Sequence, residues 1–434
     1  VLKIHYQGPV REQLNQTNVL QDVLKRDVSR SAFRGKQAYI PLHTGRNVGI
    51  GARPESGTLA RSGKQSYTSS VWHMAYLYGR ISLTGPAIAA AKDSEGSFIE
   101  LVDSEMKGLV RDLKRDVNRQ IWHDGSGLLS GIATTSSSDP TVNCKSTRFI
   151  REGQKIDLAA ISNHAAISSG TGVYVGTITG NSFELEDGDG AAVSLTTTAG
   201  THGVFVAGAH ANSSSYEMWG IEALVSDADP SNHGTEAAAT RVGEIDRSTS
   251  TFWQSNVLAA GAVVDSTLDD FQRAYDESEI EGDTTPGVIL TSHGVRRAVA
   301  GKLTTLRQFG DELELQGGWT GMKFNNAALI CDRDASTTED PGSTQLGTYD
   351  ISDGATVAAN GNFNRAYFIT PSSLQFQVLE DWQWMDEGGV LVRSGVGASA
   401  VDEFEATMFS YQNLITTRPK ANTLLTDIAT ASQA

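Results

Sequence analysis

The feature that most constrains this chain is one long amphipathic segment, Ser97 to Asp124, which follows a glycine-rich stretch. It opens with a capping box, in which the Ser97 hydroxyl can accept from the Glu100 amide while the Glu100 carboxylate reaches back. Gly125 supplies the stop, because a residue without Cβ enters the left-handed conformation at little cost. Apolar residues recur at steps of three and four along one side; they are Phe98, Val102, Met106, Leu109, Leu113, Val117 and Ile121. We therefore predict a single helix of roughly 40 Å that buries one stripe.

Charged residues occupy the other faces of this predicted helix. Opposite charges lie three or four residues apart, a spacing that brings side chains together on a helix surface. The pairs are Asp103–Lys107, Asp112–Arg115 and Asp116–Arg119. We expect all three pairs to lie away from the buried stripe.

Length, charge and cysteine content exclude several classes of protein. A chain of 434 residues is too long for one simple core and indicates two or three subdomains. A formal charge of −16 argues against sequence-reading nucleic-acid binding, which needs a basic face. No apolar run approaches membrane-spanning length and no signal peptide opens the chain, so we expect neither a membrane protein nor an exported one. Cys144 and Cys331 lack metal-type spacing, and we expect two free, buried thiols rather than a disulfide.

The segment before the long helix predicts an arm and a projecting hairpin. Apolar residues from Leu14 to Val28 give a short helical stripe that ends near Arg30, on a stretch with few other apolar residues. Residues 37–42 have a strand pattern, residues 44–63 are polar and glycine-rich, and residues 65–83 return as a β-type run. A loop this long in a compact domain is usually functional or an interface. We predict two strands around a flexible tip, which would be a liability on a monomer.

The rest of the chain predicts a small β unit followed by a mixed α/β unit. From Thr141 to about Gly208, short strand patterns alternate with turn residues, which indicates a small barrel or sandwich inserted into the chain. Beyond Trp219, helical and strand patterns alternate. Helices are predicted at 268–280 and 293–303, and strands at 287–291, 327–331, 365–379, 390–393 and 404–417.

No stretch carries a convincing catalytic or metal-binding pattern. Gly63-Lys64-Gln65 lacks the hydroxyl of a phosphate-binding loop and leads into a strand. Ser292 precedes His293 without a nucleophile elbow, so we expect Ser292 to cap a helix. The stretch Asp187 to Gly190 lacks the terminal Glu of a calcium loop, and we expect a solvated turn. We therefore expect no catalytic residue, cofactor or metal site.

An acidic stretch near the C-terminus allows two interpretations. The acid pairs Glu380-Asp381 and Asp386-Glu387 surround Trp382 and Trp384, an arrangement that could serve sugar chemistry. We favour an exposed acidic loop whose tryptophans pack at an interface.

The order of parts and several short stretches are together typical of one family. The stretches are FRGKQAYIPL at 33–42, ARPESGT at 52–58, YGRI at 78–81, DVNRQ at 116–120, the segment 317–334, and FSYQNL at 409–414. With the arm, the glycine-rich projecting loop, the long helix, the mixed α/β unit and the returning strands, the chain resembles the major capsid protein of tailed bacteriophages, which has the Hong Kong 97-type fold. The resemblance covers most of the chain and lies more in arrangement than in motifs.

This resemblance implies an α+β fold with defined parts. They are an N-terminal arm at 1–36, an extended β-hairpin loop at 37–86, a peripheral domain with the long spine helix at 87–138, a small β-rich insertion domain at 139–212, an axial α/β domain at 213–360, and returning strands of the peripheral domain at 361–434.

The resemblance also implies a structural protein rather than an enzyme. Such a protein self-assembles through pentamers and hexamers into an icosahedral shell that encloses the double-stranded DNA of a tailed phage, without sequence-specific binding. Its partners are many copies of itself, a separate scaffolding protein, a portal and a decoration or cement protein. No membrane is involved. The protein is located in the virion capsid after assembly in the host bacterial cytoplasm. Contacts between subunits are then expected at Arg53, Glu55, Arg61 and Lys64 of the extended loop, and at Glu380, Asp381, Trp382 and Trp384 of the acidic loop.

Two alternatives stay open. A bacterial nanocompartment shell of the encapsulin type would share the fold, although the length and the β insertion count against it. A β-rich glycan-binding or hydrolytic protein would use the acidic stretch around its two tryptophans.

The resemblance also bears on covalent links between subunits, because some capsid proteins of this family crosslink a Lys of the extended loop to an Asn. Lys64 could supply the amine, but residues 377–393 contain no Asn. We therefore expect no covalent link.

Overall fold

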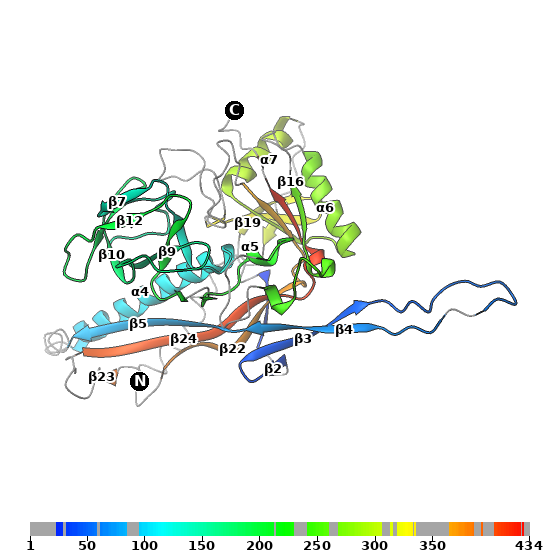
Figure 1. Ribbon diagram of the computed structural model, residues 1–434, viewed down its shortest axis with the longest axis horizontal. Coiled ribbons are helices and arrows are strands. Elements are labelled where there is room, and N and C mark those ends of the chain that lie inside the picture. Colours follow the sequence, from blue (N-terminus) through cyan, green and yellow to red (C-terminus); the bar gives the residue numbers. More distant parts are fainter. Residues whose placement is uncertain are drawn as a thin grey trace.

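The computed structural model describes residues 23–28, 32–58, 61–84, 95–211, 214–229, 241–259, 268–305, 313–315, 319–332, 334–335, 364–385, 392–393, 403–426 and 428. Of these, residues 25, 95–104, 211, 214, 259, 303–305, 313–315, 319–321 and 392–393 are described as backbone only. The fold is mixed α+β, as predicted. Figure 1 shows three parts: a long sheet with a projecting hairpin, a small β unit, and an α/β unit, the last two on the same side of the long sheet. The helix α4 (Glu95–Trp122) runs between the long sheet and the β unit.

The long sheet joins segments from distant parts of the chain. Its strands are β1 (Lys25–Asp27), β22 (Leu374–Trp384), β24 (Glu403–Thr416) and β23 (Val392–Arg393) in that order, and β5 (Ala75–Thr84) also pairs with β24. The pairing of β5 with β24 is antiparallel and runs without a break from Ala75↔Gln412 to Thr84↔Glu403. Side chains of β5 alternate between buried and exposed, which is the period of a strand with one covered face.

The helix α4 covers the buried face of β5 and confirms the predicted long helix, although it begins at Glu95 rather than Ser97. Of the predicted stripe, Met106, Leu113, Val117 and Ile121 are buried, Leu109 is partly buried, and the side chains of Phe98 and Val102 lie outside the described residues. Gly79 of β5 permits the close approach, because a Cβ there would lie 2.8 Å from Leu113 Cδ1 and 2.9 Å from Leu109 Cδ1.

We expect Leu113→Ala to lower the free energy of unfolding by about 2–3 kcal/mol, because truncation of a buried Leu loses its transfer free energy and leaves a cavity beside Gly79. Chemical denaturation of the full chain, followed by tryptophan fluorescence, measures the change. Arg111→Ala, at an exposed position of the same helix, is the matched control and should shift stability by less than about 0.5 kcal/mol. Equal effects of the two substitutions would contradict the assignment of the stripe.

The predicted N-terminal helix is wrong at its end. Lys25–Asp27 form the strand β1, which pairs in parallel with β22, so no helix extends to Arg30. Arg26 Nη2 lies 2.9 Å from Asp381 Oδ1 and fastens the strand to its neighbour. The edge of β22 offers backbone groups that a strand can pair and a helix cannot. Residues 14–22 of the predicted helix lie outside the described residues.

The projecting hairpin consists of β3 (Gln37–Gly45) and β4 (Ser66–His73), with β2 (Phe33–Arg34) beside β3 (Figure 1). Its register runs from Gln37↔His73 to Gly45↔Ser66, which leaves residues 46–65 as the tip. The predicted hairpin to residue 86 is too long, because the strand breaks at Met74 and β5 belongs to the long sheet. The covered face of β5 packs against α4, whereas β4 pairs only with β3 in the described sheet of the hairpin.

The small β unit is a closed barrel. Its strand order is β6 (Leu128–Gly131), β13 (His202–Val206), β9 (Lys155–Ala160), β10 (Val173–Thr179), β11 (Ser182–Glu186) and β8 (Thr141–Asn143). The bridge Ile132↔Cys144 joins the end of β6 to the end of β8 and closes the circle. Two further pairs accompany it: β7 (Ser136–Asp139) with β12 (Leu195–Thr197), and β14 (His210–Ala211) with β15 (Ser214–Ser215). The predicted β unit is therefore present, but it begins at Leu128 rather than residue 139, because β6 pairs with β13.

The α/β unit is built on a seven-stranded sheet. Its order is β16 (Asn256–Ala259), β25 (Thr423–Thr426), β21 (Ala366–Ile369), β17 (Val288–Thr291), β20 (Ala327–Cys331), β19 (Trp319–Phe324) and β18 (Leu313–Leu315). Helices α6 (Leu268–Gly282) and α7 (His293–Thr305) share a core with this sheet and confirm both predicted helices; α5 (Ile221–Leu224) is a single turn. The predicted boundary at 360 is corrected, because β21 and β25 come from the C-terminal segment and pair within this sheet rather than the long one.

Candidate assembly interface

The tip of the β3–β4 hairpin, residues 46–65, exposes apolar side chains that one subunit does not cover. Val48 is 81% exposed, Ile50 is 66% exposed, and Tyr67 on the adjoining strand β4 is 71% exposed. Figure 1 shows the hairpin extending away from the rest of the molecule. Apolar side chains gathered on one projecting element are typical of a surface that a partner covers. The tip is therefore the best candidate for a contact between subunits in the part of the chain that the structure describes.

The four ionic residues predicted for this interface all lie in the tip. Arg53, Glu55, Arg61 and Lys64 are exposed there, and with Arg46 they give four cations and one anion. The whole chain, in contrast, carries a formal charge of −16. A positive projection on an acidic protein favours contact with an acidic surface of another copy. Contact of these four residues with another subunit stays a prediction.

Local hydrogen bonds define the backbone of the tip. The Asn47 Oδ1 accepts from the Gly49 amide at 2.8 Å. The Arg53 guanidinium donates from Nε to the Thr58 carbonyl at 3.1 Å and from Nη1 to the Ala52 carbonyl at 2.9 Å. Arg53 thus braces its own turn while its side chain stays exposed.

The base of the hairpin is anchored by two buried tryptophans. Trp72 of β4 and Trp253 are each 1% exposed, and their ring centroids lie 6.3 Å apart. Trp253 Nε1 donates to the Val242 carbonyl at 2.6 Å. Gly243, with φ at 64°, fits against both rings, since a Cβ there would lie 3.0 Å from Trp253 and 3.2 Å from Trp72. The hairpin is therefore fixed to the body at its base while its tip projects.

Arg247 holds the loop that carries Trp253. It is fully buried and donates to the backbone carbonyls of Ala223 at 2.7 Å, Leu224 at 3.0 Å and Trp253 at 3.2 Å. Burial lowers the pKa of Arg247 to about 10, which leaves the guanidinium charged at neutral pH. No sequence pattern marks this residue, because its partners are carbonyls that any residue supplies.

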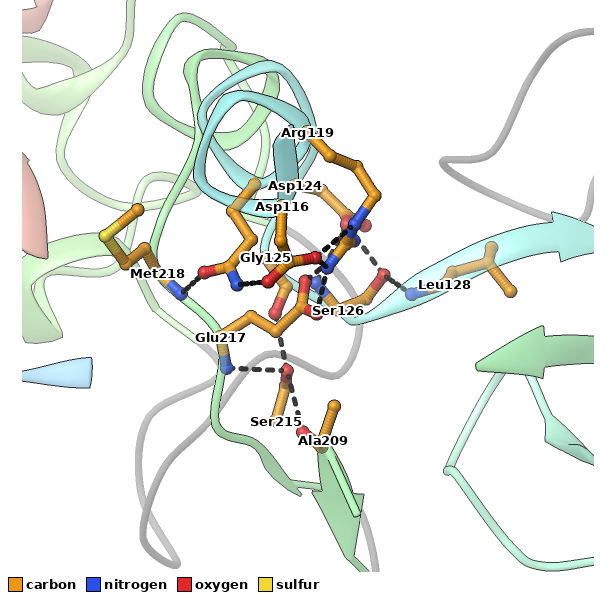
Figure 2. A network of polar contacts seen from close by, with 11 residues as sticks. Asp116, Arg119, Asp124, Gly125, Ser126, Leu128, Ala209, Ser215, Glu217 and Met218 are labelled. Carbon is orange, nitrogen blue, oxygen red and sulfur yellow. Dashed lines mark hydrogen bonds and ion pairs between the residues drawn. The ribbon is translucent and has the colours of Figure 1, made fainter. Parts of the chain in front are cut away.

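A second buried cation, Arg119, joins α4 to the segment that leaves the barrel (Figure 2). It donates from Nη2 to Asp116 Oδ1 at 2.8 Å and from Nη1 to Glu217 Oε2 at 3.1 Å. The side chains of Arg119 and Glu217 are 5% and 6% exposed. Burial alone lowers the pKa of Arg119, but the two carboxylates outweigh it and raise the pKa above its usual value. The two ends of this ion pair come from different parts of the fold, so the pair fixes their relative position.

The sequence prediction for Arg119 is right about its partner and wrong about its placement. The pair with Asp116 is confirmed, but Arg119 is buried because Glu217, 98 residues further along the chain, draws it inward. Gln120 beside it accepts from the Met218 amide at 3.2 Å. Three consecutive polar residues, 118–120, between Val117 and Ile121 are the one signal that could have indicated partners for a buried polar group.

The predicted acidic loop is wrong. Glu380, Asp381, Trp382 and Trp384 lie within the strand β22, and the two tryptophans are 5% and 4% exposed in the main core. Residues 382 and 384 share one face of a strand, which explains why they point inward together. They therefore pack inside one chain rather than at an interface, and neither ring is available to stack on a sugar. Asp386 and Glu387 lie outside the described residues.

The motifs weighed for chemistry have structural roles. Ser292 Oγ accepts from the Val295 amide at 3.4 Å at the start of α7, which confirms the predicted cap. Asp187 Oδ1 accepts from the Asp189 amide at 2.9 Å in an exposed turn, as expected. Neither cysteine forms a disulfide, as predicted; Cys144 is buried, as expected, but Cys331 is only partly buried. Within the described residues, no group of three or more His, Cys, Asp and Glu is suited to a metal ion, and no helix is long and apolar enough to cross a membrane.

Comparison with known proteins identifies the fold through structure alone. No protein-family model and no curated protein matches the sequence. A chain from the capsid asymmetric unit of cyanophage A-1(L) aligns over 97% of this chain and 92% of its own, with a TM-score of 0.51 at 10% identity. The capsid of a native GTA particle aligns over 94% and 90% (TM-score 0.44, 8% identity), and the SrpI encapsulin complex of Synechococcus elongatus over 96% and 89% (TM-score 0.41, 8% identity). By its likeness to the cyanophage chain, this protein has the fold of tailed-phage capsid proteins, the Hong Kong 97-like capsid fold.

Proposed function

We propose that this chain is the major capsid protein of a tailed bacteriophage, and that it assembles through pentamers and hexamers into an icosahedral shell around double-stranded DNA. The observation that carries the proposal is the alignment with a cyanophage capsid chain over almost the whole of both chains. The exposed, cationic hairpin tip supports it, because neighbouring copies in a shell would cover this element. A formal charge of −16 suits a container that holds a polyanion without binding it tightly. The role is structural and not enzymatic.

On this proposal each part of the fold has an assembly role. The helix α4 is the spine of the peripheral domain, the α/β unit is the axial domain, the β3–β4 hairpin is the extended loop, and the barrel is an insertion. Arg53, Glu55, Arg61 and Lys64 would form ion pairs with neighbouring copies, each worth less than about 1 kcal/mol when exposed. Their effect would come from repetition around every ring of subunits. A separate scaffolding protein, a portal and a decoration protein complete the proposed set of partners, with assembly in the host bacterial cytoplasm.

Electron microscopy of the purified full chain tests this function. We expect rings of five and six subunits and closed shells as protein concentration and crowding increase. Nuclease-protected DNA in particles from producing cells would distinguish a phage capsid from a compartment that encloses an enzyme. Isolated subunits under all of these conditions would contradict the proposal.

A further inference from the structure

The end of the barrel nearest α4 contains a buried imidazole that the proposed shell function does not use. His210 lies on β14, immediately after the turn that follows β13, and its side chain is 6% exposed. Its ring packs between two others, with centroid distances of 4.7 Å to Phe205 and 5.2 Å to His164. Ile156, Leu158 and Val204 fill the barrel core, so Asp157 and Phe205, which alternate with them, point to the outer face of the barrel wall. Two rings therefore flank a titratable group that is buried on this outer face.

Burial without a hydrogen-bond partner in the described part of the chain favours the neutral form of His210. Asp157 Oδ2 lies 3.9 Å from His210 Nε2, which is beyond hydrogen-bond distance. Both oxygens of Asp157 already accept backbone hydrogen bonds, from the Gly172 amide at 2.6 Å and the Gly208 amide at 2.8 Å. Neither ring nitrogen of His210 has a hydrogen-bond partner among the described residues. Burial lowers the pKa of His210, and this outweighs the opposite effect of Asp157.

The groups around the ring come from four elements. Asp157 belongs to β9, and His164 to the turn after β9; they are the titratable side chains that face His210. The strand β13 contributes the uncharged Phe205, and β15 places the uncharged Ser215 opposite His210 in register. No cationic side chain is therefore needed to explain the lowered pKa, because burial is its main cause.

The turn that carries His210 is tied to the junction between the barrel and α4. The Ala209 carbonyl accepts from the Tyr216 amide at 2.8 Å. The Ser215 hydroxyl donates to the Gly125 carbonyl, just beyond the end of α4 (Figure 2). Two residues later, Glu217 pairs with Arg119 of α4. A displacement of the His210 turn therefore acts directly on the exit of the barrel and on its attachment to the helix.

We propose that His210 is an acid-sensitive latch, whose protonation opens the turn at 207–211 and loosens the attachment of the barrel to α4. A proton from solvent binds one ring nitrogen, and no covalent bond is broken. The closed turn binds this proton less tightly than the open, hydrated turn, because the imidazolium would be buried with no hydrogen-bond partner for its ring nitrogens among the residues that the structure describes. Acid therefore shifts the equilibrium toward opening. The closed state is fully favoured above the ordinary His pKa of 6.5, and this advantage is lost as the pH falls from 6.5 toward the lowered value.

Hydrogen exchange of the full chain, followed by mass spectrometry at pH 7.5 and pH 5.5, tests the latch. After correction for the intrinsic exchange rates, peptides that span Phe205 to Tyr216 should lose protection by up to about tenfold at pH 5.5, one unit below 6.5. His210→Phe fills the same apolar site and cannot bind a proton, so its protection should be the same at both pH values. His202→Gln is the matched control: burial also lowers the pKa of His202, on β13 of the same barrel, and this variant should respond as the wild type does.

Two results would overturn the latch: unchanged protection in the wild type at pH 5.5, or an acid response that persists in His210→Phe. Circular dichroism and tryptophan fluorescence at pH 7.5 establish that each variant is folded. If His210→Phe does not fold, His210→Gln replaces it, with the same expected absence of an acid response. The measurement uses unassembled subunits, so its outcome is independent of whether the chain forms shells.

Discussion

Arg119→Met is expected to lower the free energy of unfolding by about 3–5 kcal/mol, because it leaves the Glu217 carboxylate buried without its cation. Trp122 follows Arg119 closely in the sequence, Trp219 follows Glu217 closely, and both tryptophans are buried. Tryptophan fluorescence during urea denaturation therefore reports the loss of structure around the pair. We expect a lower denaturation midpoint than in the wild type.

Two further variants distinguish the effect of losing the buried pair on stability from the effect of removing a positive charge. Arg115→Met makes the same substitution at an exposed position of α4 and should change stability by less than about 0.5 kcal/mol. Arg119→Met combined with Glu217→Leu removes both charges and should recover most of the lost stability, since a buried pair replaced by apolar residues is often neutral. Equal midpoints for Arg119→Met and Arg115→Met would show that the pair does not hold the junction.

Replacement of residues 46–65 by a two-residue Asn-Gly turn is expected to abolish shell formation while leaving the subunit folded. The removed tip carries the exposed Val48 and Ile50 and most of the local positive charge, but none of the buried core. Asn-Gly supports the tight turn that joins β3 to β4 directly. Circular dichroism should match the wild type, and sedimentation velocity and electron microscopy should show only subunits or open rings.

A loop deletion elsewhere is the appropriate control. Replacement of Asp187–Gly190, an exposed turn of the barrel, by Asn-Gly shortens a surface loop without touching the hairpin. Particles should form normally from that variant. Closed shells from the variant without the hairpin tip would show that residues 46–65 do not form a contact needed for assembly.

Elements whose signal is local could be predicted from the sequence. The helix α4 follows from the spacing of its apolar residues, and the burial of Met106, Leu113, Val117 and Ile121 confirms the side that faces the core. The hairpin follows from a polar, glycine-rich stretch between two strand patterns, because such a stretch has no core of its own. The cap at Ser292 follows from the preference of serine for that position.

Elements that depend on a distant partner could not be predicted. The three residues of β1 become a strand only because β22, some 350 positions away, offers an open edge. The burial of Arg119 depends on Glu217, and the inward direction of Trp382 depends on which face of β22 meets the core. Acids near a tryptophan look the same in sequence whether the segment is a loop or a strand. A residue such as Arg247, whose partners are backbone carbonyls, leaves no trace in a pattern of side chains.

The barrel enters and leaves the rest of the fold at a single place. The Val206 amide donates to the Gly127 carbonyl at 3.1 Å, and the Ser215 hydroxyl donates to the Gly125 carbonyl, so the incoming and outgoing chains are bonded to each other. A unit attached in this way can grow, shrink or be exchanged without altering the length of α4 or the spacing of the strands beneath it. Related chains can therefore differ widely in mass at this position while keeping one architecture. The same two connections between the barrel and the rest of the fold are a suitable site for inserting a foreign domain, which would then be displayed on the subunit.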